Sequence, residues 1–256
     1  MDRLLRQVSR HERAVVLLGL LLLEGAAWAY LWSGAGTLED MGGMLMPMSS
    51  GPWTPAHALV MLAMWWVMMV AMMLPSALPV ILVHASIAGR QPHAGWVTAA
   101  FTAGDLLVWG GFGVAATALQ FALERVALLS PMMELSSVAL AAATFVAAGL
   151  YQWTPLKRTC LEHCHSPLAF VMTHWRDGPR GALWMGWRHG IYCLGCCWVL
   201  MLLLFVGGLM NLVWIAALAL YVLAEKLLPG QPWVRRVAGA GLLLWGLALL
   251  WWPGFA

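Results

Sequence analysis

The sequence predicts an all-α protein, a polytopic bundle of transmembrane helices forming a single domain over residues 1–256. Hydrophobic residues make up 62% of the chain and charged residues only 10%, whereas soluble domains carry about 25% charged residues. Apolar stretches long enough to cross the hydrocarbon core of a bilayer, about 18 residues or more, recur along the chain. The net charge of +3 is small and indicates no nucleic-acid partner, and no phosphate-binding G-x-x-x-x-G-K-[ST] motif for a nucleotide is present.

Seven spans are predicted, at residues 13–32, 56–84, 95–121, 135–152, 183–207, 212–228 and 234–252. The first is not a cleaved signal peptide, because Glu24 interrupts its apolar run and no small-residue cleavage site follows. With seven spans, every Lys and Arg except Arg125 falls on one side. Since cytoplasmic loops are rich in Lys and Arg, we expect a cytoplasmic N-terminus and an outer C-terminus. A Met-rich loop, 33–55, then faces outward, and a Cys/His loop, 153–182, faces the cytoplasm.

The five cysteines lie in two stretches, "TCLEHCH" (159–165) and "YCLGCC" (192–197). Cys160 and Cys164 are four residues apart and would share one face of a helix, as would Cys193 and Cys197. If the loop folds back, four thiolates meet, which suits zinc, an iron–sulfur centre or Cu(I). Cys196 alone is explained equally well as a small buried hydrophobe. Histidines that could replace one sulfur are His163, His165, His174 and His189.

Two further interpretations of the cysteines stay open. The run C-x3-C-H is one residue longer than the c-type haem attachment motif, and it lies on the wrong predicted side for haem attachment. A thiol oxidoreductase would use the same cysteines, with Lys157 and Arg158 lowering the pKa of the neighbouring Cys160 thiol.

Methionines are clustered in and after the outward loop, and the chain has 17 of them. Four lie on one stripe of the second span, with His57 one turn before them: Met61, Met64, Met68 and Met72. Thioethers bind Cu(I) without deprotonation, so the stripe is a candidate copper path, although methionines at helical spacing are more often simple packing. Pro75 and Pro79 interrupt the same helix, a pattern that often lines a cavity.

Two acids lie deep in predicted spans, Glu24 in the first and Asp105 in the third. Ionisable groups at such depth are expensive and are candidate functional residues, Asp105 the more so because its neighbours Thr102 and Gly104 leave an open polar face. Glu225 and Lys226, at the end of the sixth span, are expected to pair at the interface.

The segments "LKRTCLEHCHSPL", "HGIYCLGCCWVLM" and "MWWVMMVAMMLPSALP" together resemble an uncharacterised bacterial family of predicted metal-binding integral membrane proteins. The resemblance covers most of the chain from the second span onward. It implies metal binding through the cysteines, which are Cys160, Cys164, Cys193, Cys196 and Cys197, and supplies no settled activity. His165 stands at a position that we expect to vary in that family.

The predicted function is therefore handling of a transition metal by a multi-pass protein of the bacterial inner membrane. Copper is favoured and zinc is second, and the metal would serve a membrane metalloenzyme or pass to or from a metallochaperone. The alternatives are the thiol oxidoreductase and a structural subunit of a membrane complex, clamped by a closed zinc site.

Overall fold

The computed structural model describes residues 2–34, 38–40, 45–47, 53–89, 93–130, 132–228 and 232–251, with side chains described for 14–34, 53–89, 93–130, 132–228 and 233–251. Helices build the fold, and the two short strands form an antiparallel pair. The elements are α1 (Asp2–Trp32), β1 (Leu38–Asp40), β2 (Leu45–Pro47), α2 (Pro55–Ala88), α3 (Ala94–Arg125), α4 (Val138–Tyr151), α5 (Pro155–His165), α6 (Pro167–His174), α7 (Gly178–Leu202), α8 (Leu204–Gly207), α9 (Leu212–Leu227) and α10 (Pro232–Trp251).

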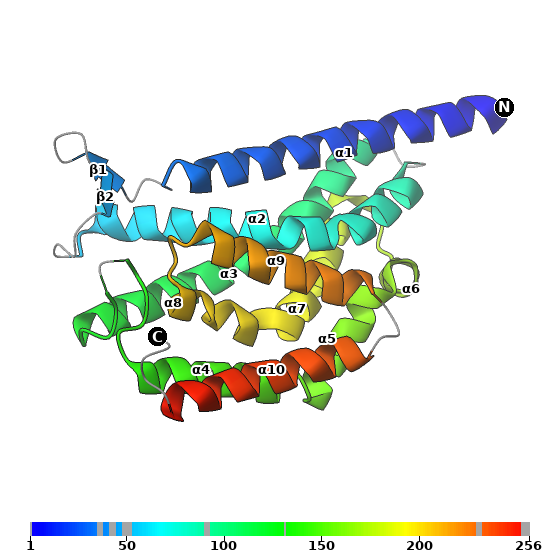
Figure 1. Cartoon of the computed structure of the whole chain (residues 1–256). Coiled ribbons are helices and arrows are strands. Elements are labelled where there is room, and N and C mark those ends of the chain that lie inside the picture. Colours follow the sequence, from blue (N-terminus) through cyan, green and yellow to red (C-terminus); the bar gives the residue numbers. More distant parts are fainter. Residues whose placement is uncertain are drawn as a thin grey trace.

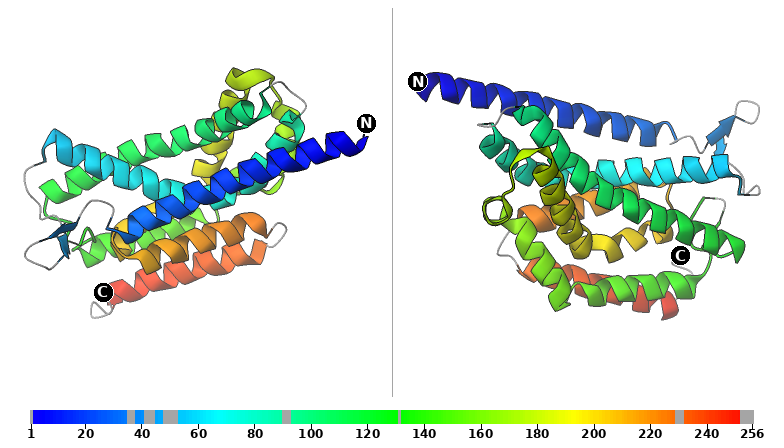
Figure 2. Two further views of the ribbon diagram at one scale, coloured as in Figure 1. Left: turned by 90° about the horizontal axis from the view of Figure 1, so that it is seen from above. Right: turned by 180° about the vertical axis from the view of Figure 1, so that it is seen from behind.

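The long helices run lengthwise between two ends of the bundle (Figure 1). One end of the bundle holds the start of α1, the short helices α5 and α6, the end of α9 and the start of α10. The β1–β2 pair, the connection from α3 to α4 and the end of α10 lie at the other, and both further views agree (Figure 2). Helices α5 and α6 of the Cys/His segment and the β1–β2 pair are therefore at opposite ends of the bundle.

Five helices are long and apolar enough to cross a membrane, by length and composition: Ala14–Trp32, Pro55–Ala88, Ala94–Arg125, Gly178–Gly207 and Trp233–Trp251. These five helices agree with the prediction of a membrane protein with several spans. The other two predicted spans are shorter, because α4 has 14 residues and α9 has 16, whereas a perpendicular span needs about 20. Ser137 caps α4 by accepting a hydrogen bond from the Leu140 amide, so the helix begins later than hydropathy predicts.

The predicted loop at 153–182 is largely helical. Thr154 accepts from the Lys157 amide and is followed by Pro155, so α5 begins with a capped first turn and a proline that needs no hydrogen bond there. Pro167 likewise stands in the first turn of α6, although the preceding Ser166 makes no side-chain capping hydrogen bond. Much of the Met-rich segment 33–55 lies outside the described residues.

Glycines allow α3 and α7 to pack closely. A Cβ atom at Gly104 would collide with the carbonyl oxygen of Leu183, and one at Gly186 would collide with that of Phe101. Small residues at such crossings let membrane helices approach one another and gain van der Waals contact. The contact fixes the position of α7, which carries three of the cysteines.

Candidate metal site

Helices α5 and α7 pack against each other and bring together the two cysteine stretches. All five cysteines are free, four of them buried and Cys164 partly buried. The Cys164 side chain on α5 interacts with the Cys196 side chain on α7, and this interaction shifts the pKa of the Cys164 thiol upward. The Cys160 side chain lies against Gly195 of α7. A Cβ atom added to Gly195 would be only 2.6 Å from the Cys160 sulfur. Gly195 is therefore the residue that lets α5 approach this closely.

Two thiols of α7 lie close to a backbone carbonyl oxygen of their own helix. The Cys196 and Cys197 sulfurs lie 3.0 and 3.1 Å from the carbonyl oxygen of Cys193. Cys197 also lies 3.9 Å from the Met73 sulfur of α2. We refer to the five cysteines and Met73 together as the thiol cluster.

Helix α9 contributes a cation to the thiol cluster. The Lys226 ammonium donates to the Cys193 sulfur at 2.7 Å and to the Ser76 hydroxyl at 2.9 Å. Lys226 is only 5% exposed. Ser76 donates its own proton to the carbonyl oxygen of Met73 at 2.8 Å, so its oxygen accepts from the ammonium.

The neighbouring Glu225 faces α5 instead. Its carboxylate is 2.7 Å from the Lys157 ammonium, with the two side chains 3% and 0% exposed. His165 at the end of α5 bonds to the Glu225 carbonyl oxygen at 2.8 Å. The prediction that Glu225 and Lys226 pair with each other is wrong, because consecutive residues of a helix point in different directions.

The two thiols of α5 are shifted toward their protonated form. Burial raises the pKa of the Cys160 thiol, and the nearby Cys196 raises it further. The interaction with Cys196 and, after it, burial hold the pKa of the Cys164 thiol well above its ordinary value. A metal that binds these sulfurs must therefore displace protons.

The predicted histidines have other partners. His163 stacks on Tyr192 with ring centroids 4.0 Å apart, and its Nδ1 lies 2.9 Å from the Thr159 carbonyl oxygen. His174 lies against Phe170, with Nδ1 3.0 Å from that residue's carbonyl oxygen. Within the described residues, no three His, Cys, Asp or Glu side chains converge in a group that could hold a metal ion. A closed four-ligand site is thus not preformed there.

His189 instead pairs with one of the predicted intramembrane acids. Its Nδ1 lies 2.7 Å from Asp105 Oδ1, and both side chains are buried. Glu24, the other acid, accepts a hydrogen bond from the Trp28 indole at 2.8 Å. Each carboxylate has a second buried oxygen without a hydrogen-bond partner among the described residues. The two acids thus belong to separate local pairs.

The methionine stripe is buried along α2, since Met61, Met64, Met68 and Met72 are each at most 1% exposed. At one end of α2, His57 packs edge-on against Trp53. Next to it, the Gln120 amide nitrogen lies 3.4 Å from the Met61 sulfur and 3.6 Å from the Met133 sulfur. The methionine that contacts a cysteine in the thiol cluster is Met73, which is not part of the predicted stripe.

Sequence reasoning missed Met73, Met133, Ser76 and Lys226. Three of them carried a usable signal: Met73 and Ser76 flank the Leu74–Pro75 interruption of α2, and Lys226 is a charge at the end of an otherwise apolar helix. Met133 carried none, because it lies in a connection after α3 and has a left-handed backbone, with φ of 58°.

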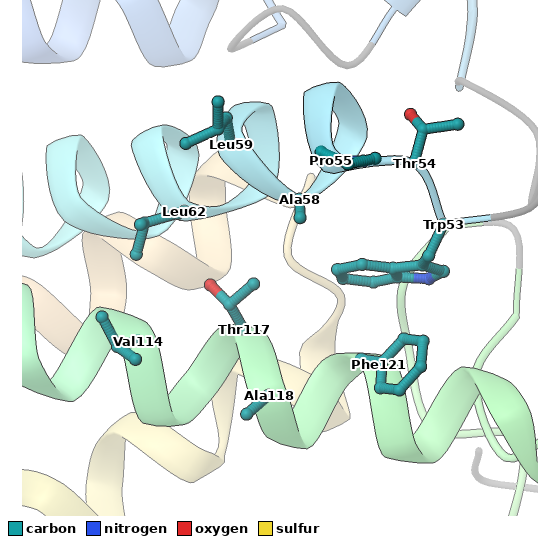
Figure 3. Close-up of a pocket in the computed structure, with 10 residues that line it drawn as sticks. All are labelled: Trp53, Thr54, Pro55, Ala58, Leu59, Leu62, Val114, Thr117, Ala118 and Phe121. Atoms are coloured by element: carbon teal, nitrogen blue, oxygen red, sulfur yellow. The ribbon is translucent and has the colours of Figure 1, made fainter.

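A pocket of about 680 Å³ opens between the start of α2 and the end of α3. Figure 3 shows its lining, which is apolar apart from Thr54, Thr117 and the Trp53 indole nitrogen. This lining offers no sulfur, imidazole or carboxylate, so we assign no metal to the pocket.

No curated protein and no solved structure matches the chain. A family match does exist: residues 62–249 match the model of the PpoB2 family, whose description is copper chaperone. The matched segment includes all five cysteines, Met73 and Lys226. It spans most of the 256 residues, and the chain therefore belongs to this copper chaperone family.

Proposed function

We propose that the protein is a multi-pass membrane protein that binds Cu(I) at the thiol cluster and transfers it to a membrane metalloenzyme or another metallochaperone. The observation that carries the proposal is the packing of α5 against α7, which brings the cysteines of the two helices together and places the Cys160 sulfur over Gly195, the residue before Cys196. A Cu(I) ion held between cysteines of both helices would tie α5 to α7. Cys193, Cys197 and Met73 offer further soft sulfurs close by.

Copper fits this donor set better than zinc. Thiolate and thioether sulfurs favour Cu(I), which needs few ligands, whereas structural zinc sites take four. The described residues hold no converging group of three or more His, Cys, Asp or Glu ligands, and the family description names copper. The zinc-clamped subunit has no such support.

For the membrane topology we propose the seven-span arrangement, with α4 and α9 as short spans within the bundle. The end that carries α5 and α6 would face the cytoplasm of a bacterial inner membrane, because the basic residues concentrate there. Reporter fusions at residue 165 should then be active only as cytoplasmic reporters, and fusions at residue 45 only as outer ones. A periplasmic reporter active at residue 165 would refute this topology.

We also propose that methionines guide Cu(I) along α2. Met61 and Met133 flank Gln120 near one end of the helix, and Met73 meets Cys197 at the thiol cluster. The buried stripe lies between these two places in the sequence of α2. Neutral thioethers can pass a soft cation onward because each holds it only weakly.

The proposal is tested by Cu(I) binding to purified protein in detergent, without oxygen, in competition with a Cu(I) chelator. Cys164→Ser and Cys196→Ser should each weaken binding at least about tenfold, since each removes a thiolate ligand. Met172→Leu is the control, because it removes a sulfur that is 63% exposed on α6. Copper binding that both serine variants leave unchanged would refute the site.

The interaction between Cys164 and Cys196 favours one alternative, a thiol oxidoreductase that forms a disulfide between them. The two functions differ in what the protein contains after anaerobic purification. Bound copper with two free thiols supports the chaperone, whereas a titratable disulfide and no copper binding supports the oxidoreductase.

A further inference from the structure

A buried ammonium group lies within the thiol cluster. The Lys226 Nζ atom is 2.7 Å from the Cys193 sulfur and 2.9 Å from the Ser76 hydroxyl. Burying a lysine in a membrane protein is expensive, and such a residue usually has a partner that compensates its charge. The identity of that partner decides what Lys226 does.

No carboxylate in the described part of the chain lies within ion-pair distance of Lys226. The neighbouring Glu225 forms an ion pair with Lys157 at 2.7 Å, and Asp105 pairs with His189 at the same distance. These two pairs can each be neutral as a unit. Among the described residues, the hydrogen-bond partners of Lys226 are thus the Ser76 hydroxyl and the Cys193 sulfur, and of these two the thiol is the acidic group.

The charge of a bound metal then becomes the deciding quantity. Cu(I) with two thiolates carries a net charge of −1, and the ammonium would bring the site to zero. A divalent ion with the same two thiolates is already neutral, and the ammonium would leave the buried site with a charge of +1. Uncompensated charge is costly at this depth, so one lysine would favour the monovalent ion.

We propose that Lys226 is the specificity-determining counter-cation of the thiol cluster, which makes the cluster select Cu(I) over divalent Zn(II). The proposal rests on the copper-binding function proposed above. In this proposal Lys226, whose ammonium is hydrogen-bonded to the Cys193 sulfur, neutralises the negative charge of Cu(I) bound by two thiolates of the cluster without coordinating the metal. Ser76 holds the ammonium in that place from α2.

The test measures Cu(I) and Zn(II) affinities of the same detergent-purified protein, each against a chelator of known affinity. Lys226→Met removes the charge and keeps most of the side-chain volume. It should weaken Cu(I) binding about tenfold and strengthen Zn(II) binding about tenfold, so the affinity ratio should shift on the order of a hundredfold, as expected for one unit charge a few ångströms away.

Three further variants separate charge from fold. Lys226→Arg keeps the charge and should stay within about threefold of the wild-type ratio, and Arg158→Gln should leave the ratio unchanged because the Arg158 side chain is 69% exposed. Ser76→Asp puts a carboxylate beside the ammonium and should shift the ratio in the same direction as Lys226→Met. It therefore tests the idea even if the methionine variant does not fold.

The outcomes distinguish failure of the proposed role of Lys226 from failure of the proposed copper-binding function. Tight Cu(I) binding by the wild type, with a ratio that neither Lys226→Met nor Ser76→Asp changes, overturns the role of Lys226 alone. An arginine variant that shifts the ratio as far as the methionine variant does also overturns it, because shape rather than charge would then matter. A wild-type protein that binds no Cu(I) overturns the proposed function and this inference together.

Discussion

The ion pair between Lys157 and Glu225 should stabilise the docking of α5, and Lys157→Met should expose this. The pair is 2.7 Å long, with side chains 0% and 3% exposed. Removing one partner of a buried pair costs about 3–5 kcal/mol, because the other charge is left without compensation. Glu225 would keep a 3.3 Å hydrogen bond from the Tyr221 hydroxyl, so we expect a value near the lower limit, about 3 kcal/mol.

The assay is thermal unfolding in detergent, followed by tryptophan fluorescence. A loss of about 3 kcal/mol corresponds to a fall in Tm of about 6–12 °C for a chain of this size. The double variant Lys157→Met with Glu225→Leu should recover most of the loss, since buried pairs are often replaced by apolar residues at little cost. The exposed pair of Arg158 and Glu162, with side chains 69% and 60% exposed, supplies the control, and its removal should cost less than about 1 kcal/mol.

Two results would refute the reasoning. A Tm of Lys157→Met within about 2 °C of the wild type would mean that the pair contributes less than about 1 kcal/mol. A double variant as unstable as the single one would mean that lost packing, not an unpaired carboxylate, is the cause.

Three further predictions follow from other parts of the structure. Cu(I) affinity should rise with pH because the pKa of the Cys164 thiol is held above its ordinary value, so binding displaces a proton. The rise should be about tenfold per pH unit for each proton displaced. Cys164→Ser should reduce this slope of affinity against pH between about pH 6 and pH 8. Met61→Leu with Met133→Leu should slow copper uptake into vesicles, assayed by copper analysis, while the Cu(I) affinity in detergent stays within about threefold, because neither sulfur lies in the thiol cluster. Gly186→Ala should cost about 1–3 kcal/mol in thermal unfolding, because its Cβ meets a carbonyl oxygen of α3, whereas Gly111→Ala, with nothing within 4 Å, should be tolerated.

Hydropathy was enough to predict the long apolar helices. Long apolar runs have to become helices in a membrane, because every backbone polar group needs a partner within its own segment. Thr154 and Pro155 begin α5 inside the segment 153–182, which was predicted to be a loop. The ends of α4 depended on a connection that folds back through a bridge between Leu129 and Leu135, which no periodicity in the sequence reveals.

The thiol cluster was predictable in part. The spacing of Cys160 and Cys164 anticipated a helical dithiol, and α5 does pack against α7. Cys196 interacts with Cys164 although it is the cysteine most easily explained as packing, and α7, which carries it, also packs closely on α3 through Gly104 and Gly186. This arrangement involves three helices at once and cannot be derived from spacing within one.

The candidate histidines near the cysteines in sequence have other hydrogen-bond partners in the structure. His163 and His174 each bond to the carbonyl oxygen four residues earlier in their own helix, a local partner that is always within reach. His189 found a distant one in Asp105. The sequence shows that an imidazole is near the cysteines. The hydrogen bonds that the imidazole makes elsewhere determine its orientation, and these cannot be read from the sequence.

The incomplete coordination of the thiol cluster is consistent with a carrier. Structural zinc sites are closed by four ligands and hold their metal as part of the fold. A chaperone has to release its cargo, and a site formed by cysteines of α5 and α7 can open when α5 moves. Lys226 and Ser76 come from α9 and α2, so the compensating charge would stay in the bundle while the α5 ligand leaves. Cu(I) with one remaining thiolate is neutral, so the ammonium would then leave the buried site with a charge of +1, and this uncompensated charge would favour departure of the ion toward a partner's sulfur.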